Sequence, residues 1–589
     1  MIIRKSKLLL LILFLVSCTT HFNINNTTNQ LNINSSYSIN ISATNTDVNY
    51  LIITSDDFVN ILESLAQWKT QKGVISKIEV ISDIEQQYSG GTLPEKIKNC
   101  INDYYNNNNT QWVLLAGDQD HVPTKYIVCD DGYIYDGDVV SCDSYYGDMD
   151  NDWSQEEFDY EVEVYIGRLT ANSRAEMQNL VQRILNYEKN PPVGDWMTNA
   201  LFAGAILQYN IDWDYDNKVD FGECDANRLH HFINTTLIPD NWTSTFLAQT
   251  QGIKGSNYSC DAELGYSNLK NAINEGCSVG TIIAHGRPER ISVSEWVTDF
   301  DGDLLFDYTA DPFFGGGTAI DEMTWEILFE TTTADLKEAD KLGIYYFGSC
   351  SVGTFDYTQD CVAEYFLKKA AIGCVAGSYV VWGEDQWYER AHGGWFVDGL
   401  GYRFWEQLFH YNQPGKALAL AKADYASDRI SSSEPKEYSE WGNKTLKQFN
   451  LLGDPEVPIW LSIPKRLNVS VDQPFDNNTN TMTLLVTAEG SPVNETTVTY
   501  TENNELIWIG ETHENGTIKV PFSQIEIDNL VFTASKKGFL PYQANLPESG
   551  SPGIIAGYEV CIISLTILGF IGIISVYYRQ SLIKKEQNN

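Results

Sequence analysis

In this chain of 589 residues, the stretch from Leu342 to Tyr357 limits the possible folds more than any other. It is apolar from Ile344 to Phe347, and then turns small and polar through a Gly-Ser pair into Cys350. This pattern predicts a buried strand that delivers a thiol into a loop at its carboxyl end.

A second apolar run, from Ser278 to Ile283, ends in the same way at His285. If both runs are neighbouring parallel strands, their carboxyl ends meet at one edge of an open α/β sheet, where such folds bind their ligands. We therefore expect the thiol of Cys350 and the imidazole of His285 to lie at the same edge.

Predicted strands and helices alternate around these two runs. Tyr50–Thr54 and Trp112–Ala116 read as buried strands, whereas Phe58–Lys72 has apolar residues at helical spacing. Such alternation predicts parallel sheets with helices on both faces, a doubly wound α/β fold. We expect two α/β subdomains of this kind, residues 48–195 and residues 196–465.

The pattern changes after residue 465. Short strand patterns separated by Asn, Gly and Pro fill residues 466–546, and helical runs are absent there. This composition predicts a small immunoglobulin-like β-sandwich. The polar stretch Arg429–Asn443, just before it, reads as a loop.

The amino terminus has the layout of a secretory signal peptide over residues 1–18, with basic residues before the apolar run Leu8–Val16. The run ends in Leu-Val-Ser-Cys18, which resembles a lipoprotein cleavage box with Cys18 acylated; ordinary cleavage nearby is the alternative. Residues 19–47 are rich in Asn, Thr and Ser and read as a flexible polar spacer.

Near the carboxyl terminus, a spacer at residues 547–553 precedes a predicted transmembrane helix at residues 554–578. Basic residues in the tail 579–589 predict that this tail is cytoplasmic. The sequence therefore predicts a cell-surface protein whose bulk is extracellular and anchored in the membrane. Asn-X-Ser/Thr glycosylation motifs fall between the two apolar segments and agree with this topology.

The chain is strongly acidic, with 39 Lys and Arg against 79 Asp and Glu, a net charge of −40. A phosphate backbone would be repelled by such a charge, which argues against nucleic acid as a partner. Eleven cysteines are present. Some of them can pair in an oxidising exterior, but the sequence does not give the connectivity.

A thiol becomes a strong nucleophile when a histidine accepts its proton or stabilises its thiolate. A single cysteine after a strand is more often a buried small hydrophobic residue. The words around Cys350 and His285 decide between these readings.

These words are AHG, GSC, FDY, Cys361-Val-Ala-Glu364, Trp382-Gly-Glu-Asp385 and Leu452-Gly-Asp-Pro455. Between about Tyr50 and Leu461, their order resembles that of the gingipain-type cysteine peptidases. The resemblance implies a caspase-like fold for both α/β subdomains. It also implies that Cys350 is the nucleophile, that His285 is the general base and acid, and that the N–H groups of Gly286 and Cys350 form the oxyanion hole.

The segment that begins at Trp382 resembles the part of a lysine-specific gingipain whose aspartate lies at the bottom of the substrate pocket. The resemblance implies that Asp385, with Trp382 beside it, selects protein or peptide substrates with a basic residue before the cleaved bond. The alternative is that Glu384 and Asp385 are solvated loop acids.

One departure from the family pattern weighs against catalysis. Gingipain-type peptidases place a carboxylate that orients the histidine where this chain has Ile206 and Leu207. Either another group, such as Asp212, orients His285, or a bare Cys–His dyad operates. Two rival functions remain open: an inactive, calcium-binding surface or adhesion protein, and a transpeptidase that resolves the same thioester with an amine.

Carboxylates also recur at the spacing of an EF-hand loop, which binds Ca²⁺ through oxygen ligands. The predicted structural calcium site consists of Asp212, Asp214, Asp216, Asp220 and Glu223. Shorter D-x-D-x-D patterns begin at Asp148 and Asp299. Acid-rich surface turns are the alternative for all three patterns, and no zinc-type arrangement of cysteines and histidines is present.

Overall fold

The structure is a computed structural model, and its described part excludes both termini and several internal stretches. The described residues are 47–129, 138–150, 160–212, 218–219, 222–299, 302, 304–307, 322–384, 394–430, 436–476, 478–502, 505–521 and 530–545.

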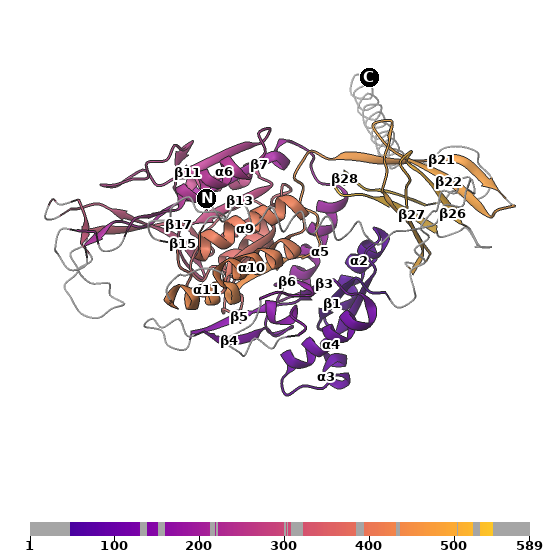
Figure 1. Ribbon diagram of the computed structural model, residues 1–589, viewed down its shortest axis with the longest axis horizontal. Helices are drawn as coiled ribbons and strands as arrows, with labels where there is room; N and C mark the ends of the chain where they lie inside the picture. Colours follow the sequence, from indigo (N-terminus) through magenta and orange to yellow (C-terminus); the bar gives the residue numbers. More distant parts are fainter. Residues whose placement is uncertain are drawn as a thin grey trace, which may run out of the picture. The chain divides into compact units, whose positions relative to one another are not determined.

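One sheet of eleven strands organises the α/β part, in the order β12-β11-β7-β13-β18-β19-β20-β6-β3-β1-β2 (Figure 1). Its strands are β1 Tyr50–Thr54, β2 Ser76–Val80, β3 Trp112–Ala116, β6 Tyr165–Leu169, β7 Asn199–Gly204, β11 Thr243–Ala248, β12 Ala262–Glu263, β13 Val279–Ile283, β18 Gly343–Phe347, β19 Ala371–Gly377 and β20 Phe449–Gly453. All neighbouring pairs are parallel except β19 with β20.

The sheets expected for the two α/β subdomains are therefore continuous. Strand β20 joins them because it runs antiparallel to β19 of the second subdomain and parallel to β6 of the first. Every residue of β18, β19 and β20 is buried, so both faces of the sheet centre are covered. This matches the expectation for a doubly wound parallel sheet, whose strands are apolar on both faces.

The helices lie between the strands in sequence, as the alternation predicts. They are α2 Val59–Gln71, α3 Ile81–Gln87, α4 Leu93–Asn108, α5 Arg174–Lys189, α6 Ala226–Thr236, α7 Tyr266–Glu275, α8 Val362–Lys369, α9 Phe396–Tyr411, α10 Pro414–Ile430 and α11 Lys436–Gln448. Helices α9, α10 and α11 pack against one another beside the sheet (Figure 1).

Helix α11 corrects the sequence prediction, which read Arg429–Asn443 as a loop. Few apolar residues mark this helix in the sequence, but Trp441 stacks on Trp382 with ring centroids 5.5 Å apart, and Leu446 is fully buried. Tertiary packing of a few large side chains thus stabilises a helix whose composition alone favours a loop.

A buried ion network joins the amino-terminal helices to the end of β20. Lys69 Nζ lies 2.8 Å from Glu188, 2.6 Å from Asp454 and 2.6 Å from Glu456, and the Lys69 side chain is completely buried. Lys72 also contacts Glu188 and Glu456. The Leu-Gly-Asp-Pro word therefore contributes its aspartate to the packing of the two halves of the sheet.

The described residues between 465 and 545 form a β domain of two sheets, antiparallel except for the pairing of β21 with β28. One sheet contains β21 Lys465–Asp476, β22 Thr481–Ala488, β23 Ser491–Pro492, β26 Thr517–Pro521 and β28 Phe539–Leu540. The other contains β24 Thr497–Glu502, β25 Glu505–Glu511, β27 Leu530–Ser535 and β29 Tyr542–Asn545. Apolar residues of both sheets share one core, so the sandwich is present; its immunoglobulin-like type stays a prediction.

The predicted signal peptide, polar spacers, membrane helix and cytoplasmic tail all fall, apart from a residue or so at their borders, outside the described residues. Within the described ranges, no helix combines the length and the apolar character needed to cross a membrane. The cysteines in these ranges are free thiols: Cys100, Cys129, Cys142, Cys224, Cys260, Cys277, Cys350, Cys361 and Cys374.

Candidate active site

Strands β13 and β18 bring the predicted dyad to one edge of the sheet. They are parallel neighbours, with Ile282 opposite Phe347. Beyond this pair, the Gly348 N–H donates to the Ile282 carbonyl at 3.0 Å, and the Ala284 N–H donates to Ser349 Oγ at 3.1 Å. The two strand ends are thus tied together one residue before each of the predicted catalytic side chains.

Gly286 and Cys350 touch through their backbones. A Cβ atom at Gly286 would lie 2.5 Å from the Cys350 carbonyl oxygen and 3.0 Å from its backbone nitrogen, too close for any side chain. Glycine is therefore required for this approach. The contact brings together the two residues that the family resemblance identifies as oxyanion donors, and it places Cys350 beside the residue that follows His285.

The Cys350 thiol donates to the Val381 carbonyl at 3.4 Å. Burial raises the thiol pKa above its usual value, although the charge of Lys444 favours the thiolate. Cys350 therefore rests as a neutral thiol, and an attack of its sulfur on a carbonyl would require a base.

His285 is held by uncharged groups. Its Nε2 lies 3.2 Å from Ser294 Oγ, and its ring forms a second hydrogen bond to the backbone of Leu207. Burial lowers the pKa of His285 to about 4, although the Leu207 hydrogen bond favours the protonated ring. The backbone of Leu207 thus contacts the histidine where the family pattern has a carboxylate side chain. The alternative partner that the sequence suggested, Asp212, has no described side chain.

A buried amide connects the two segments that contact His285. Gln249 Oε1 accepts from the Ile206 N–H at 3.1 Å, and Gln249 Nε2 donates to the Ser294 carbonyl at 2.7 Å and to the Tyr209 hydroxyl at 3.1 Å. Sequence reasoning missed Gln249 and Ser294 because neither belongs to a recognisable motif. They are found only when β15 (Arg290–Trp296) is paired with the strand that begins at His285, and when the ends of β7 and β11 are brought together.

The specificity residues are only partly described. Asp385 lies outside the described residues, and Trp382 stacks on Trp441. Glu384 is 2% exposed, and its carboxylate accepts from the Trp395 N–H at 2.9 Å. Its own N–H donates to Asp398 at 2.9 Å. Glu384 is therefore not a solvated loop acid, as the alternative held.

A small pocket opens next to this segment. Its lining consists of Glu223, Cys224, Asp225, Arg228, Leu229, Tyr258, Glu384 and Asp398. Burial, together with the nearby Glu384 carboxylate, raises the pKa of Asp398 to about 7. Gly383 connects the pocket to the dyad, because a Cβ there would lie 2.9 Å from Cys224 Sγ and 3.0 Å from the Leu207 side chain.

The predicted EF-hand-like loop lies mostly outside the described residues. Asp214, Asp216 and Asp220 are not described, and of Asp212 only the backbone is, in the short strand β9 Ile211–Asp212. Glu223 is described, and it forms an ion pair with Lys254 at 2.5 Å. The calcium prediction for this loop stays untested.

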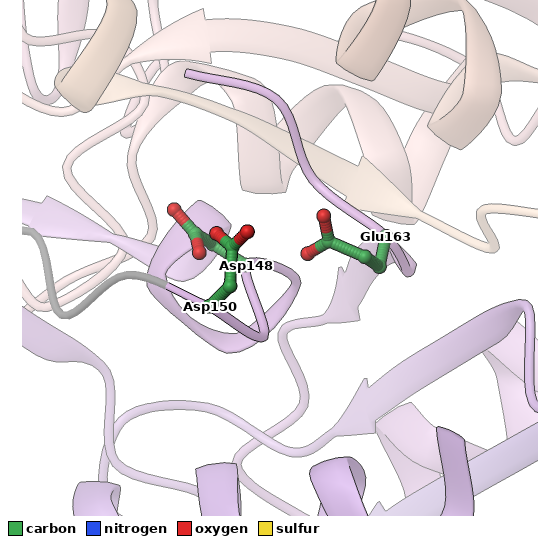
Figure 2. Close-up of side chains that lie close together, drawn as sticks. All are labelled: Asp148, Asp150 and Glu163. Carbon is green, nitrogen blue, oxygen red and sulfur yellow. The ribbon is translucent and has the colours of Figure 1, made fainter. Parts of the chain in front are cut away.

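A different carboxylate cluster forms at the weaker pattern that begins at Asp148. Oxygen atoms of Asp148, Asp150 and Glu163 lie within 4.8 Å of one another, with Asp148 buried and Glu163 half-buried (Figure 2). The loop is fixed by the Met149 N–H, which donates to Glu163 at 2.7 Å, and by the Gly147 carbonyl, which accepts from the Glu163 N–H. Sequence reasoning missed Glu163 because it follows the D-x-D-x-D pattern only after a further stretch of chain.

The state of the dyad predicts the pH dependence of catalysis. A protonated imidazole cannot accept the Cys350 proton. As the pH is lowered, kcat/KM should therefore fall only near pH 4, where His285 becomes protonated. A histidine with its ordinary pKa of about 6.5 would give a fall near pH 6.5 instead. The measurement is kcat/KM for an uncharged peptide as a function of pH, with folding checked by fluorescence at each pH. An acid limb centred near 6.5 in a fully folded protein would contradict the lowered pKa of His285.

Sequence comparison identifies the family of this chain and two of its relatives. The sequence profile of Peptidase family C25 matches residues 43–460. Gingipain R2 of Porphyromonas gingivalis is 20% identical over 421 residues, which cover 71% of this chain and 47% of that protein. Lys-gingipain W83 of Porphyromonas gingivalis is 24% identical over 366 residues, covering 58% of this chain and 16% of that protein. The chain thus spans less than half the length of these relatives.

Solved structures agree on the fold. The crystal structure of the Arg-specific cysteine proteinase gingipain R superposes with a TM-score of 0.58 at 14% identity, over 85% of this chain and 98% of that one. The complex of Porphyromonas gingivalis gingipain pro- and mature domains gives a TM-score of 0.57 at 15% identity, over 84% and 98%. The α/β fold is therefore that of gingipain. Since the family profile covers most of the chain, this protein belongs to peptidase family C25, the gingipain-type cysteine peptidases.

Proposed function

We propose that this protein is a cysteine endopeptidase that acts outside the cell, with Cys350 as nucleophile and His285 as general base and acid. The observation that carries the proposal is the joining of the β13 and β18 ends, where the backbone of Cys350 contacts Gly286 directly after His285. Family membership supplies independent support.

The chemistry follows from the neutral pair. The Cys350 thiol turns from Val381 towards the imidazole and loses its proton to it as sulfur attacks the scissile carbonyl carbon. The N–H groups of Gly286 and Cys350 stabilise the resulting oxyanion. The imidazolium then protonates the departing amine as the C–N bond breaks, and a water molecule, activated by the same histidine, hydrolyses the thioester and frees the thiol.

The departure from the family pattern at Ile206 and Leu207 does not favour the inactive alternative. The Leu207 backbone and the Ser294 hydroxyl both hold the His285 ring, and Gln249 fixes the segments that carry them. An inactive surface protein would have no need for this buried arrangement around one histidine.

We further propose a preference for Lys or Arg immediately before the cleaved bond. The pocket beside Gly383 gathers four acidic side chains, Glu223, Asp225, Glu384 and Asp398, against one basic side chain in its lining, Arg228. Burial raises the pKa of Asp398 and of Asp225. Carboxylates that are crowded and desolvated in this way are stabilised by an arriving cation. Asp385, the specificity residue that the family resemblance implies, follows Glu384 in the sequence.

Cleavage-site mapping tests the proposal. The full chain is incubated with a peptide library of mixed composition, and the new termini are identified by mass spectrometry, with Cys350→Ala as the control for contaminating peptidases. We expect Cys350-dependent cuts, mostly after Lys and Arg. Cuts without such a preference would overturn the specificity and leave the endopeptidase assignment standing, whereas products longer than their substrates would identify a transpeptidase.

A structural calcium ion is the second proposal, at Asp148, Asp150 and Glu163 and at the loop from Asp212 to Glu223. Three carboxylates whose oxygens lie so close repel one another when all are ionised, and Ca²⁺ removes that repulsion. At a free Ca²⁺ concentration of about a hundred times the Kd, binding would stabilise the folded state by roughly 2.7 kcal/mol.

Chelation should therefore lower the melting temperature of the protein. The double variant Asp148→Asn/Glu163→Gln should lose this response if the cluster in Figure 2 binds the ion, and Asp212→Asn/Asp214→Asn should lose it if the loop does. Glu505→Gln, an exposed acid of the β domain, serves as the control. Identical melting curves of the parent protein with and without chelator would exclude a structural calcium ion at both places.

The location proposed for this activity is the cell surface. It rests on the apolar segments at the two ends of the chain and on the basic tail that follows the second.

A further inference from the structure

A small antiparallel sheet projects from the dyad. Its strands are β14 His285–Arg287, β15 Arg290–Trp296 and β17 Met323–Glu330, in that order, so β17 is the edge strand among the described residues. His285 itself begins β14. A molecule that binds on this sheet therefore lies close to the catalytic base.

The strand register places large apolar side chains on the face that carries His285. His285 is opposite Ser292, which is opposite Ile327; two residues further along, Ser294 is opposite Trp325. Residues directly opposite in an antiparallel pair point to the same face. The His285, Trp325 and Ile327 side chains thus share one face.

Trp325 and Ile327 are unusually exposed for their size. Trp325 is 58% exposed and Ile327 is 44% exposed. The Trp325 ring packs edge-on against the His285 ring, with centroids 4.9 Å apart. Isolated exposed apolar residues are common, but two of them on one face beside a catalytic base form a surface that a ligand would cover.

The chemistry of peptide hydrolysis determines which ligand. His285, as general acid, must protonate the nitrogen of the departing amine, and that nitrogen belongs to the residue that follows the cleaved bond. The face next to His285 is therefore on the leaving-group side of the substrate. The acidic pocket lies elsewhere, bordered by the segment that contains Val381 and Gly383.

We propose that Trp325 and Ile327 bind the substrate residues that follow the cleaved bond and select bulky apolar side chains there. This inference rests on the proposed endopeptidase function and adds a second determinant of specificity to it. An extended substrate would cross the dyad with a basic side chain on one side and an apolar side chain on the other.

The test compares two series of peptides that differ only after the cleaved bond, one with Leu or Phe and one with Gly. The readout is the ratio of kcat/KM for the apolar peptide to that for the glycine peptide. We expect this ratio to exceed about ten in the parent and to fall by about tenfold in Trp325→Ala, the scale that apolar side-chain contacts give. Trp325→Phe, which keeps an aromatic ring, should retain most of the ratio.

Two isoleucines offer a matched pair. Ile327→Ala should lower the ratio, whereas Ile507→Ala, on a β-domain strand and 41% exposed, should leave it at the parental value. A parent that cleaves both series equally, or a Trp325→Ala variant with the parental ratio, would overturn the inference. Absence of any Cys350-dependent cleavage would instead overturn the proposed function on which it rests.

A second readout follows how the thioester is resolved after the amide has been cleaved. Added amines can intercept the thioester: the amine nitrogen bonds to the carbonyl carbon as the C–S bond breaks, and the thiol is regenerated. By microscopic reversibility the amine occupies the leaving-group site. Phenylalaninamide should therefore compete with water better than glycinamide in the parent, and Trp325→Ala should remove this difference.

Discussion

Replacing Cys350 by alanine is expected to abolish peptide cleavage, with a loss of about four to six orders of magnitude in kcat. Alanine removes the thiol of Cys350 and keeps the backbone that contacts Gly286, and oxyanion donors alone cannot form a covalent intermediate. His285→Ala should cause a similar loss. The double variant should be no worse than either single variant, because nucleophile and base act as one unit.

The matched control is Cys374→Ala. Cys374 is a fully buried thiol of β19, next to β18 in the sheet, so the same substitution removes a buried sulfur without touching the dyad. Turnover should remain in this variant. If Cys350→Ala cleaves peptides at the parental rate, the assigned nucleophile is wrong.

Replacing Lys69 by methionine is expected to reduce the free energy of unfolding by about 3–5 kcal/mol. The substitution leaves Glu188, Asp454 and Glu456 buried together with Lys72 as the one remaining cation of the network. In the parent, burial alone would raise the pKa of Glu188, but the charges of Lys69 and Lys72 outweigh it and lower the pKa to about 2. Urea unfolding of both proteins measures the difference.

The stability that the Lys69 network contributes should depend on pH. In the parent, the depressed pKa of Glu188 contributes stability that is complete above its ordinary value of about 4.5 and is lost as the pH falls towards 2. In Lys69→Met, protonation of the crowded acids should instead remove their mutual repulsion. The difference in the free energy of unfolding between variant and parent should therefore become smaller in mild acid.

Lys465→Met provides the control for the loss of an ion pair as such. Lys465 and Glu489 lie 2.6 Å apart, but their side chains are 57% and 66% exposed, and exposed pairs contribute at most about 1 kcal/mol. Equal destabilisation by the two substitutions would show that burial of the Lys69 network is not the source of its energy.

The parts of the site that the sequence predicted are those carried by strand ends. Apolar runs that stop in small polar residues identified β13 and β18, and parallel pairing then required His285 and Cys350 to share an edge. The two halves of the sheet were predicted separately because nothing in the Leu-Gly-Asp word shows that β20 pairs with both β19 and β6.

The partners of His285 were beyond reach for a physical reason. A backbone group such as that of Leu207 has no sequence signature, and Ser294 and Gln249 reach the site only through the pairing of β15 with β14 and of β11 with β7. The same holds for helix α11, which Trp441 stabilises by stacking on Trp382. Spacing along the chain identifies groups at strand ends, whereas packing determines which groups surround them.

Covalent trapping of Cys350 tests directly whether this residue is the nucleophile of a peptidase. The full-length protein is treated with a peptidyl acyloxymethyl ketone that carries a lysyl or arginyl end, then digested, and the modified residue is identified by mass spectrometry. One thioether should form, on Cys350, at the same rate as activity is lost, and substrate should slow its formation. Modification of another thiol, such as the half-exposed Cys260, with Cys350 unmodified in the inactivated enzyme, would contradict this assignment.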